Sequence, residues 1–143
     1  MTSAPAEADR QLRDRVAGPG VHVVHVWAPW CDNSLAELAP VWAGSSTHLV
    51  GDADSVTFVT VWNDGASGAD ALRQHGVEFP EIVVPGPKPD KADRRMTLLG
   101  LPVTWIPTTW VFNRGGLLAT AFNYGEITAA RLAEAIADAR RDW

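Results

Sequence analysis

The sequence of 143 residues holds a single cysteine, Cys31, and has 12 lysines and arginines against 17 aspartates and glutamates. One cysteine cannot form an internal disulfide, so the disulfide frameworks of small secreted domains are excluded. The net charge of −5, with no basic run carrying interleaved aromatics, argues against a nucleic-acid or anionic-membrane surface. We therefore expect no nucleic-acid partner.

Long hydrophobic runs are also missing. No apolar stretch reaches the roughly 20 residues that a membrane-spanning helix needs, and the charged start, Met1 to Arg15, lacks the apolar core of a signal peptide. We expect no membrane partner and a cytoplasmic location, although a trimmed export signal would leave no trace. With 46% apolar residues, the chain fits one domain, residues 1–143, around an ordinary core.

The first half of the chain alternates helical and strand patterns. Leu12 and Val16, spaced by four, predict a short helix within an N-terminal extension, residues 1–19. The nearly continuous apolar run at 21–27 is typical of an interior strand covered on both faces. The elements expected next are a helix at 34–49 that Pro40 kinks, a strand at 56–62 and a helix at 67–75.

The second half has a different order. Turn-forming residues are dense between 77 and 102, where we expect a short strand at 82–84 and then a surface loop, residues 84–96. Two strands, 109–113 and 117–122, flank Arg114-Gly115-Gly116 and predict an antiparallel hairpin, and an amphipathic helix follows at 128–141. The fold class is therefore α/β, with β-α-β-α followed by β-β-α.

Two motifs give this order a family resemblance. Trp27-Ala28-Pro29-Trp30-Cys31 ends the first strand, and Ile106-Pro107-Thr108 opens the hairpin. Together they resemble the thioredoxin superfamily over most of the chain. Ser34-Leu35-Ala36-Glu37-Leu38, residues 72–80 and residues 107–116 further resemble its TlpA-like or redoxin branch. The resemblance implies a thioredoxin-like fold, a central mixed sheet flanked by helices with an extra N-terminal helix, and thiol–disulfide chemistry.

Cys31 is the first candidate catalytic residue. A cysteine between the end of a strand and the start of a helix meets free backbone N–H groups, which stabilise a thiolate. Asp32 is a neighbouring negative charge that opposes ionisation if its carboxylate faces the sulfur. The alternative for a lone cysteine is an inert buried thiol, but the motif around Cys31 favours a reactive one.

Ser34 stands where the family has its second cysteine. Its hydroxyl could donate a hydrogen bond to a Cys31 thiolate, but it cannot release a mixed disulfide, so an external thiol must do so. Ser34-Leu35-Ala36-Glu37 also reads as a capping box, with Ser34 as N-cap and Glu37 reaching back to it. The resemblance implies a second role for Glu37, because a glutamate at this position is associated with tuning of the active-site thiols.

His25 lies two residues before Trp27, where thioredoxins keep a buried acid that accepts protons. A histidine there could relay protons near neutral pH. The alternative is a neutral core histidine bonded to the backbone. His22 points to the other face of the strand, and the remaining histidines are isolated in sequence, so we expect neither a metal site nor a bound cofactor.

The resemblance also outlines a substrate groove. Pro107 matches the cis-proline that lies beside the cysteine and exposes the preceding backbone to an extended substrate. Trp30 and Trp105 are expected at an apolar rim around the thiol, whereas Trp27, Trp42, Trp62 and Trp110 are expected in the core. The other expected groove residues are Asp32, Asn33, Ile106 and Thr108.

Several functions fit this pattern. The leading hypothesis is a monothiol thiol–disulfide oxidoreductase in which Cys31 forms mixed disulfides with a protein cysteine or a low-molecular-weight thiol. A redox-inactive binding module that kept the groove is the second. A glutathione-linked iron–sulfur carrier is the third, since Cys31-x-x-Ser34 has the spacing of monothiol glutaredoxins. Ser34 could also be an engineered replacement of a resolving cysteine. Oligomeric state and substrate are left open.

Overall fold

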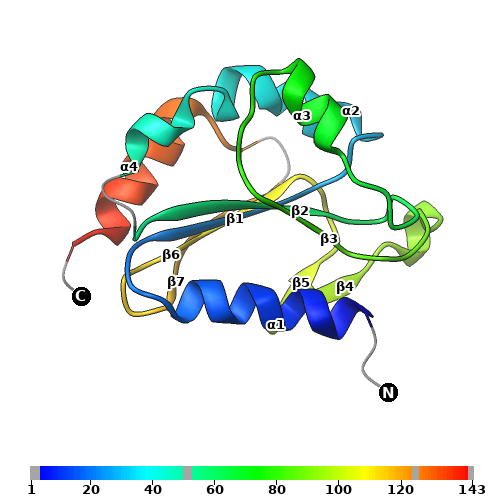
Figure 1. Cartoon of the computed structure of the whole chain (residues 1–143), viewed down its shortest axis with the longest axis horizontal. Coiled ribbons are helices and arrows are strands. Elements are labelled where there is room, and N and C mark those ends of the chain that lie inside the picture. Colours follow the sequence, from blue (N-terminus) through cyan, green and yellow to red (C-terminus); the bar gives the residue numbers. More distant parts are fainter. Residues whose placement is uncertain (1–3, 50–52, 124–125, 142–143) are drawn as a thin grey trace.

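The computed structural model describes residues 4–49, 53–123 and 126–141. A mixed sheet with the strand order β3-β2-β1-β6-β7 forms its centre (Figure 1). The strands are β1 (His22–Trp27), β2 (Ser55–Thr60), β3 (Glu81–Val83), β6 (Thr108–Phe112) and β7 (Leu118–Phe122). The expected α/β class, with a central mixed sheet flanked by helices, is confirmed.

Strand β1 lies in the middle of the sheet. It pairs in parallel with β2, where His25 faces Phe58, and antiparallel with β6, where His25 faces Thr109. All its residues are buried. This burial on both faces explains why its sequence is nearly continuously apolar.

The helices cover the two faces of the sheet unequally. Helix α1 (Ala4–Ala17) lies on one face, and α2 (Asp32–Glu37), α3 (Ala69–Gln74) and α4 (Ala129–Ala139) lie on the other (Figure 1). The fully buried Leu12 joins α1 to the core on its face. None of the helices in the described ranges is long and apolar enough to cross a membrane.

The segment expected as one kinked helix is broken into three short pieces. Helix α2 ends at Glu37, a π-helical segment follows over Leu38–Trp42, and a 3-10 turn spans Ser45–His48. Pro40 has no N–H to donate to the preceding turn, which accounts for the widened helix at this point. Leu38 and Trp42 are nevertheless fully buried, so the interruption still supplies core side chains.

A second, two-stranded sheet was not expected from the sequence. Strands β4 (Met96–Leu98) and β5 (Leu101–Val103) form an antiparallel hairpin after a 3-10 turn at Lys91–Asp93. The hairpin turn places Leu99 at φ 56° and Gly100 at φ 75°. The backbone N–H of Leu99 donates a hydrogen bond to Asp9 Oδ1 at 2.5 Å, which fastens this hairpin to α1.

Candidate functional site

Cys31 lies at the junction of β1 and α2. Its backbone has extended dihedral angles, and its carbonyl accepts a hydrogen bond from the N–H of Leu35 at 3.0 Å, which makes Cys31 the N-cap of α2. Its side chain is half-buried and is a free thiol. The sulfur lies 3.9 Å from the carbonyl oxygen of Ile106. The following peptide bond, Ile106–Pro107, is cis.

Ser34 does not act as the N-cap, and this part of the sequence interpretation is wrong. The helix begins two residues earlier than expected, so Ser34 is its third residue and is fully buried. Its hydroxyl accepts a hydrogen bond from the backbone N–H of Ala28 at 3.4 Å. Within the described part of the chain no hydrogen bond joins it to the Cys31 sulfur.

Glu37 likewise does not reach back to the start of the helix. It is the last residue of α2 and is 9% exposed. Its Oε2 lies 3.8 Å from Nε2 of His25, beyond hydrogen-bond distance. The helix therefore carries the Glu37 carboxyl toward the middle of β1 instead of toward its own N-terminus.

His25 is fully buried beneath this carboxyl. Its Nδ1 lies 2.8 Å from the Thr109 hydroxyl on the neighbouring strand, so its partner is a side chain and not the backbone. The imidazole ring packs against Trp42 and Phe58, at centroid distances of 4.4 and 4.8 Å. Nε2 of His25, Oε2 of Glu37 and Nε1 of Trp42 are buried and make no hydrogen bond among the described residues.

Burial decides the protonation of this pair. It lowers the pKa of His25 to about 3, because a buried imidazolium loses its hydration. Burial also raises the pKa of Glu37 to about 7. The nearby Trp42 indole lowers this pKa by a smaller amount, although its N–H makes no hydrogen bond with the carboxylate. The group that titrates near neutral pH is therefore Glu37, while His25 stays neutral.

A hollow of about 440 Å³ opens beside the thiol. Beside Cys31 itself, three of the expected groove residues line it: Asn33, Trp105 and Ile106. Trp105 exposes 60% of its surface beside this hollow. Asp32 is exposed and does not line the hollow, and the buried Thr108 donates a hydrogen bond from its hydroxyl to the Trp105 carbonyl.

Trp30 was expected at the rim, but it is half-buried and does not line the hollow. Its indole N–H donates a hydrogen bond to the Trp62 carbonyl at 2.8 Å. Two cations lie over its ring, with Lys88 Nζ 4.0 Å and Arg94 Cζ 4.8 Å from the centroid. Trp27, Trp42, Trp62 and Trp110 are buried, in agreement with their expected place in the core.

Sequence reasoning missed half of the hollow. Its other lining residues are Trp62, Lys91, Arg94, Arg95 and Thr104. The signal was present in the sequence, because residues 88–95 contain four of the 12 basic residues of the chain. Turn-forming residues drew the interpretation toward a surface loop, and periodicity does not say where such a segment lies in space. Among the described residues, no group of three or more His, Cys, Asp or Glu could hold a metal ion.

Comparisons with known proteins give structural matches only. No protein-family profile and no curated protein sequence matches the chain. A DsbF homologue from Corynebacterium diphtheriae matches with a TM-score of 0.65 and 25% identity, over 85% of this chain and 73% of that one. A thioredoxin-family thiol:disulfide interchange protein from Chlorobium tepidum matches with a TM-score of 0.63 and 16% identity, over 88% and 83%. StoA from Bacillus subtilis matches with a TM-score of 0.59 and 18% identity, over 82% and 83%.

These matches agree with the central mixed sheet and its flanking helices. This chain combines the strand order β3-β2-β1-β6-β7 with a cysteine at the start of a helix, whose sulfur faces the Ile106 carbonyl. The chain therefore has the thioredoxin-like fold, and it is similar to the redoxin branch of disulfide oxidoreductases that the DsbE-type and DsbF-type structures represent.

Proposed function

We propose that the chain is a monothiol thiol–disulfide oxidoreductase that forms mixed disulfides at Cys31. The observation that carries the proposal is the half-buried Cys31 sulfur 3.9 Å from the Ile106 carbonyl, in a hollow wide enough for a reaction partner. The Cys31 thiolate attacks one sulfur of a disulfide, a new S–S bond forms, and the other sulfur leaves as a thiolate.

The second half of the reaction needs a thiol from outside the chain. Cys31 is the only cysteine, and the Ser34 hydroxyl cannot attack a disulfide. A protein thiol or a low-molecular-weight thiol must therefore attack the mixed disulfide and restore Cys31. The protein partners and any small co-substrate are proposed on this ground, with no bound cofactor.

Mass spectrometry tests the reaction directly. Incubation with bis(2-hydroxyethyl) disulfide is expected to add one half-molecule of the reagent per chain, and a small thiol should remove it. Cys31→Ser should take up none. The rate constant is compared with that of a free cysteine peptide at the same pH; a Cys31 that reacts with no disulfide, although the chain is folded, would sink the proposal.

A redox-inactive binding module is the second candidate. It is favoured by Ser34, whose buried hydroxyl gives the site no resolving group, and by Trp105, which exposes 60% of its surface beside the hollow. Cys31→Ser separates the two candidates in cells that depend on the protein. If cells carrying Cys31→Ser behave like cells carrying the unmodified chain, the binding module is supported. If they behave like cells that lack the protein, exchange is supported.

A further inference from the structure

The hollow beside Cys31 is lined by positive charge. Three of its nine lining residues, Lys91, Arg94 and Arg95, are basic, and none is acidic. The chain as a whole carries a net charge of −5, so the positive lining of the hollow contrasts with the negative charge of the rest of the chain. A cavity with walls of one sign raises the local concentration of molecules of the opposite sign.

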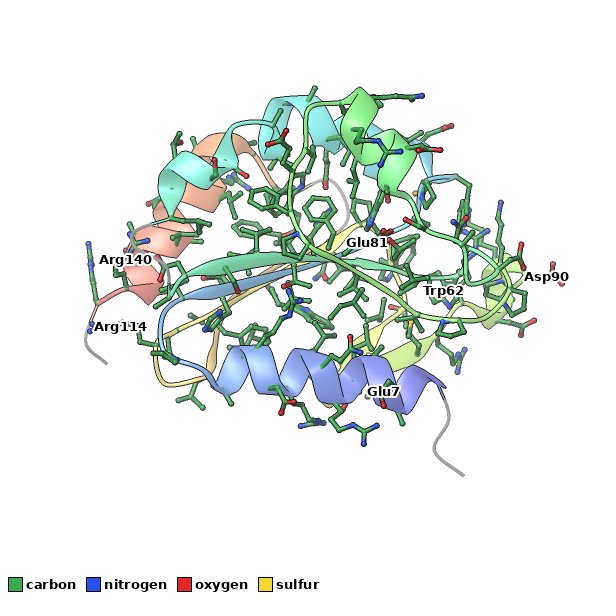
Figure 2. All side chains as sticks on the ribbon, in the orientation of Figure 1. Glu7, Trp62, Glu81, Asp90, Arg114 and Arg140 are labelled. Atoms are coloured by element: carbon green, nitrogen blue, oxygen red, sulfur yellow. The ribbon has the colours of Figure 1, made fainter. Side chains whose placement is uncertain are left out.

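The basic residues come from one segment between β3 and β4. Figure 2 shows Trp62 and Asp90 at the same end of the molecule, away from Arg114 and Arg140. The segment also contains Asp90 and Asp93, but neither lines the Cys31 hollow. Asp93 lines a second hollow, bounded by Pro85 and Pro87, and Arg95 lines both hollows. The acids of the segment are therefore absent from the lining around the thiol, whereas three of its four cations belong to it.

Contacts with Trp30 hold this segment against the site. Lys88 and Arg94 lie over the indole ring, and Arg94 Nε donates a hydrogen bond to the Pro89 carbonyl at 3.3 Å. Cation–π contacts of this kind order long basic side chains. Trp30 directly precedes Cys31, so these contacts hold the segment beside the residue that carries the thiol.

Lys91 and Arg95 are left available to a ligand. Both are exposed, and neither makes a hydrogen bond or ion pair with any residue that the structure describes. Arginine and lysine are the side chains that bind carboxylates through charge-assisted hydrogen bonds. Two unpaired cations in the same hollow as the thiol suit a reaction partner that carries carboxylates near its sulfur.

We infer that Cys31 exchanges preferentially with low-molecular-weight disulfides that carry carboxylates. The inference rests on the proposed exchange at Cys31 and adds the class of its substrate. The volume of about 440 Å³ is that of a small-molecule site. In the step itself, the Cys31 thiolate bonds to one sulfur of the anionic disulfide and is oxidised, while the other sulfur leaves as a reduced anionic thiolate.

Three small symmetric disulfides that differ in charge test the inference. They are 3,3′-dithiodipropionate, which is anionic, bis(2-hydroxyethyl) disulfide, which is neutral, and cystamine, which is cationic. Each rate constant for the full-length chain is divided by the rate constant of a free cysteine peptide with the same reagent, which removes intrinsic differences between reagents. We expect this ratio to be about tenfold higher for the anionic reagent than for the neutral one at low salt, to fall as salt is added, and to be smallest for cystamine.

Two matched double variants locate the effect. Lys91→Gln/Arg95→Gln should remove most of the anionic preference, measured within the variant as the normalised rate constant for the anionic reagent divided by that for the neutral one. Arg10→Gln/Arg131→Gln removes the same charge from α1 and α4, outside the hollow, and should leave the preference intact. Equal ratios for the anionic and neutral reagents, or equal effects of the two variants, would overturn the inference while leaving exchange at Cys31 in place.

Two further outcomes separate the inference from its alternatives. No reaction with any of the three reagents would overturn the proposed function, and the inference with it. An acidic cysteine peptide, supplied as its disulfide, is the last arm. The small-molecule assignment is wrong if two results are found together. The peptide disulfide reacts faster than 3,3′-dithiodipropionate, and Lys91→Gln/Arg95→Gln slows the peptide reaction without slowing the 3,3′-dithiodipropionate reaction. The hollow then binds protein segments.

Discussion

The Cys31 sulfur and the Ile106 carbonyl oxygen lie 3.9 Å apart, although 75 residues separate them in the chain. The contact exists because β1 and β6 are neighbours in the sheet, so that the segment after β1 and the segment before β6 meet at one edge. Ile106 is 6% exposed and lines the same hollow as Cys31. A group bonded to Cys31 would therefore lie against this backbone.

Ser34→Cys should convert the site into a two-thiol site. Residues three apart at a helix start lie on the same side of the helix, so the introduced thiol can reach a disulfide at Cys31. We expect the mixed disulfide to be released without external thiol, with formation of an internal disulfide. Intact-mass spectrometry under non-reducing conditions would show the loss of the adduct and of two hydrogens, about 2 Da.

Ser34→Ala is the matched control for this prediction. It removes the hydroxyl that accepts from the Ala28 N–H but supplies no nucleophile. Its mixed disulfide should persist as long as that of the unmodified chain. An adduct that persists equally in Ser34→Cys would show that the buried position keeps the introduced thiol away from Cys31.

His25 and Glu37 predict pH effects of opposite sign. The pKa of Glu37 is raised to about 7, so its contribution to the free energy of unfolding is complete below about pH 4.5 and is lost as the pH rises through 7. The pKa of His25 is lowered to about 3, so its contribution is complete above about pH 6.5 and is lost as the pH falls toward 3. Between about pH 4.5 and 6.5, unfolding releases a proton from Glu37 and binds one at His25, and the two slopes cancel.

Glu37→Gln should remove the pH dependence that Glu37 contributes to the free energy of unfolding and leave that of His25. We expect the free energy of unfolding of the variant to rise by about 1 kcal/mol per pH unit, relative to the unmodified chain, between about pH 5 and 6.5. Urea titrations across this range measure the difference. Glu78→Gln, on an exposed residue, should show no such slope. Parallel curves for Glu37→Gln and the unmodified chain would show that the pKa of Glu37 is not raised in the folded state.

The main sheet was predictable from sequence because its strands carry strong patterns. The continuous apolar run of β1 and the glycine turn between β6 and β7 are local signals, and both lead to the observed pairing. The β4–β5 hairpin carries no such signal. Its strands have three residues each, and Leu99 takes a left-handed backbone conformation that leucine rarely adopts.

The site was predictable where a motif names the residue and unpredictable where tertiary placement decides. Cys31 and Pro107 belong to motifs, and the structure brings their segments together. Ser34 is of a residue type that is common at N-caps, but the N-cap of α2 is Cys31, and Ser34 is buried inside the first turn. The approach of Glu37 to His25 depends on how α2 packs over β1, which residue spacing does not encode.

Gly68 packs so closely against the Trp27 ring that no side chain fits between them. A Cβ on this residue would lie 2.6 Å from Cζ2 and 2.8 Å from Cη2 of Trp27, a fully buried residue at the end of β1. Gly68→Ala must therefore displace the indole or the start of α3. We expect the free energy of unfolding to fall by about 1–3 kcal/mol, measured by urea denaturation.

Gly115→Ala is the control for Gly68→Ala. The nearest atom to its added Cβ is Asn113 Oδ1 at 3.4 Å, an ordinary contact, so we expect a change within about 0.5 kcal/mol. Since Trp27 lies four residues before Cys31, a displaced indole should also slow disulfide exchange in Gly68→Ala and not in Gly115→Ala. Equal stability and equal exchange rates in the two variants would mean that the Trp27 ring moves aside freely, and that its packing does not position the cysteine.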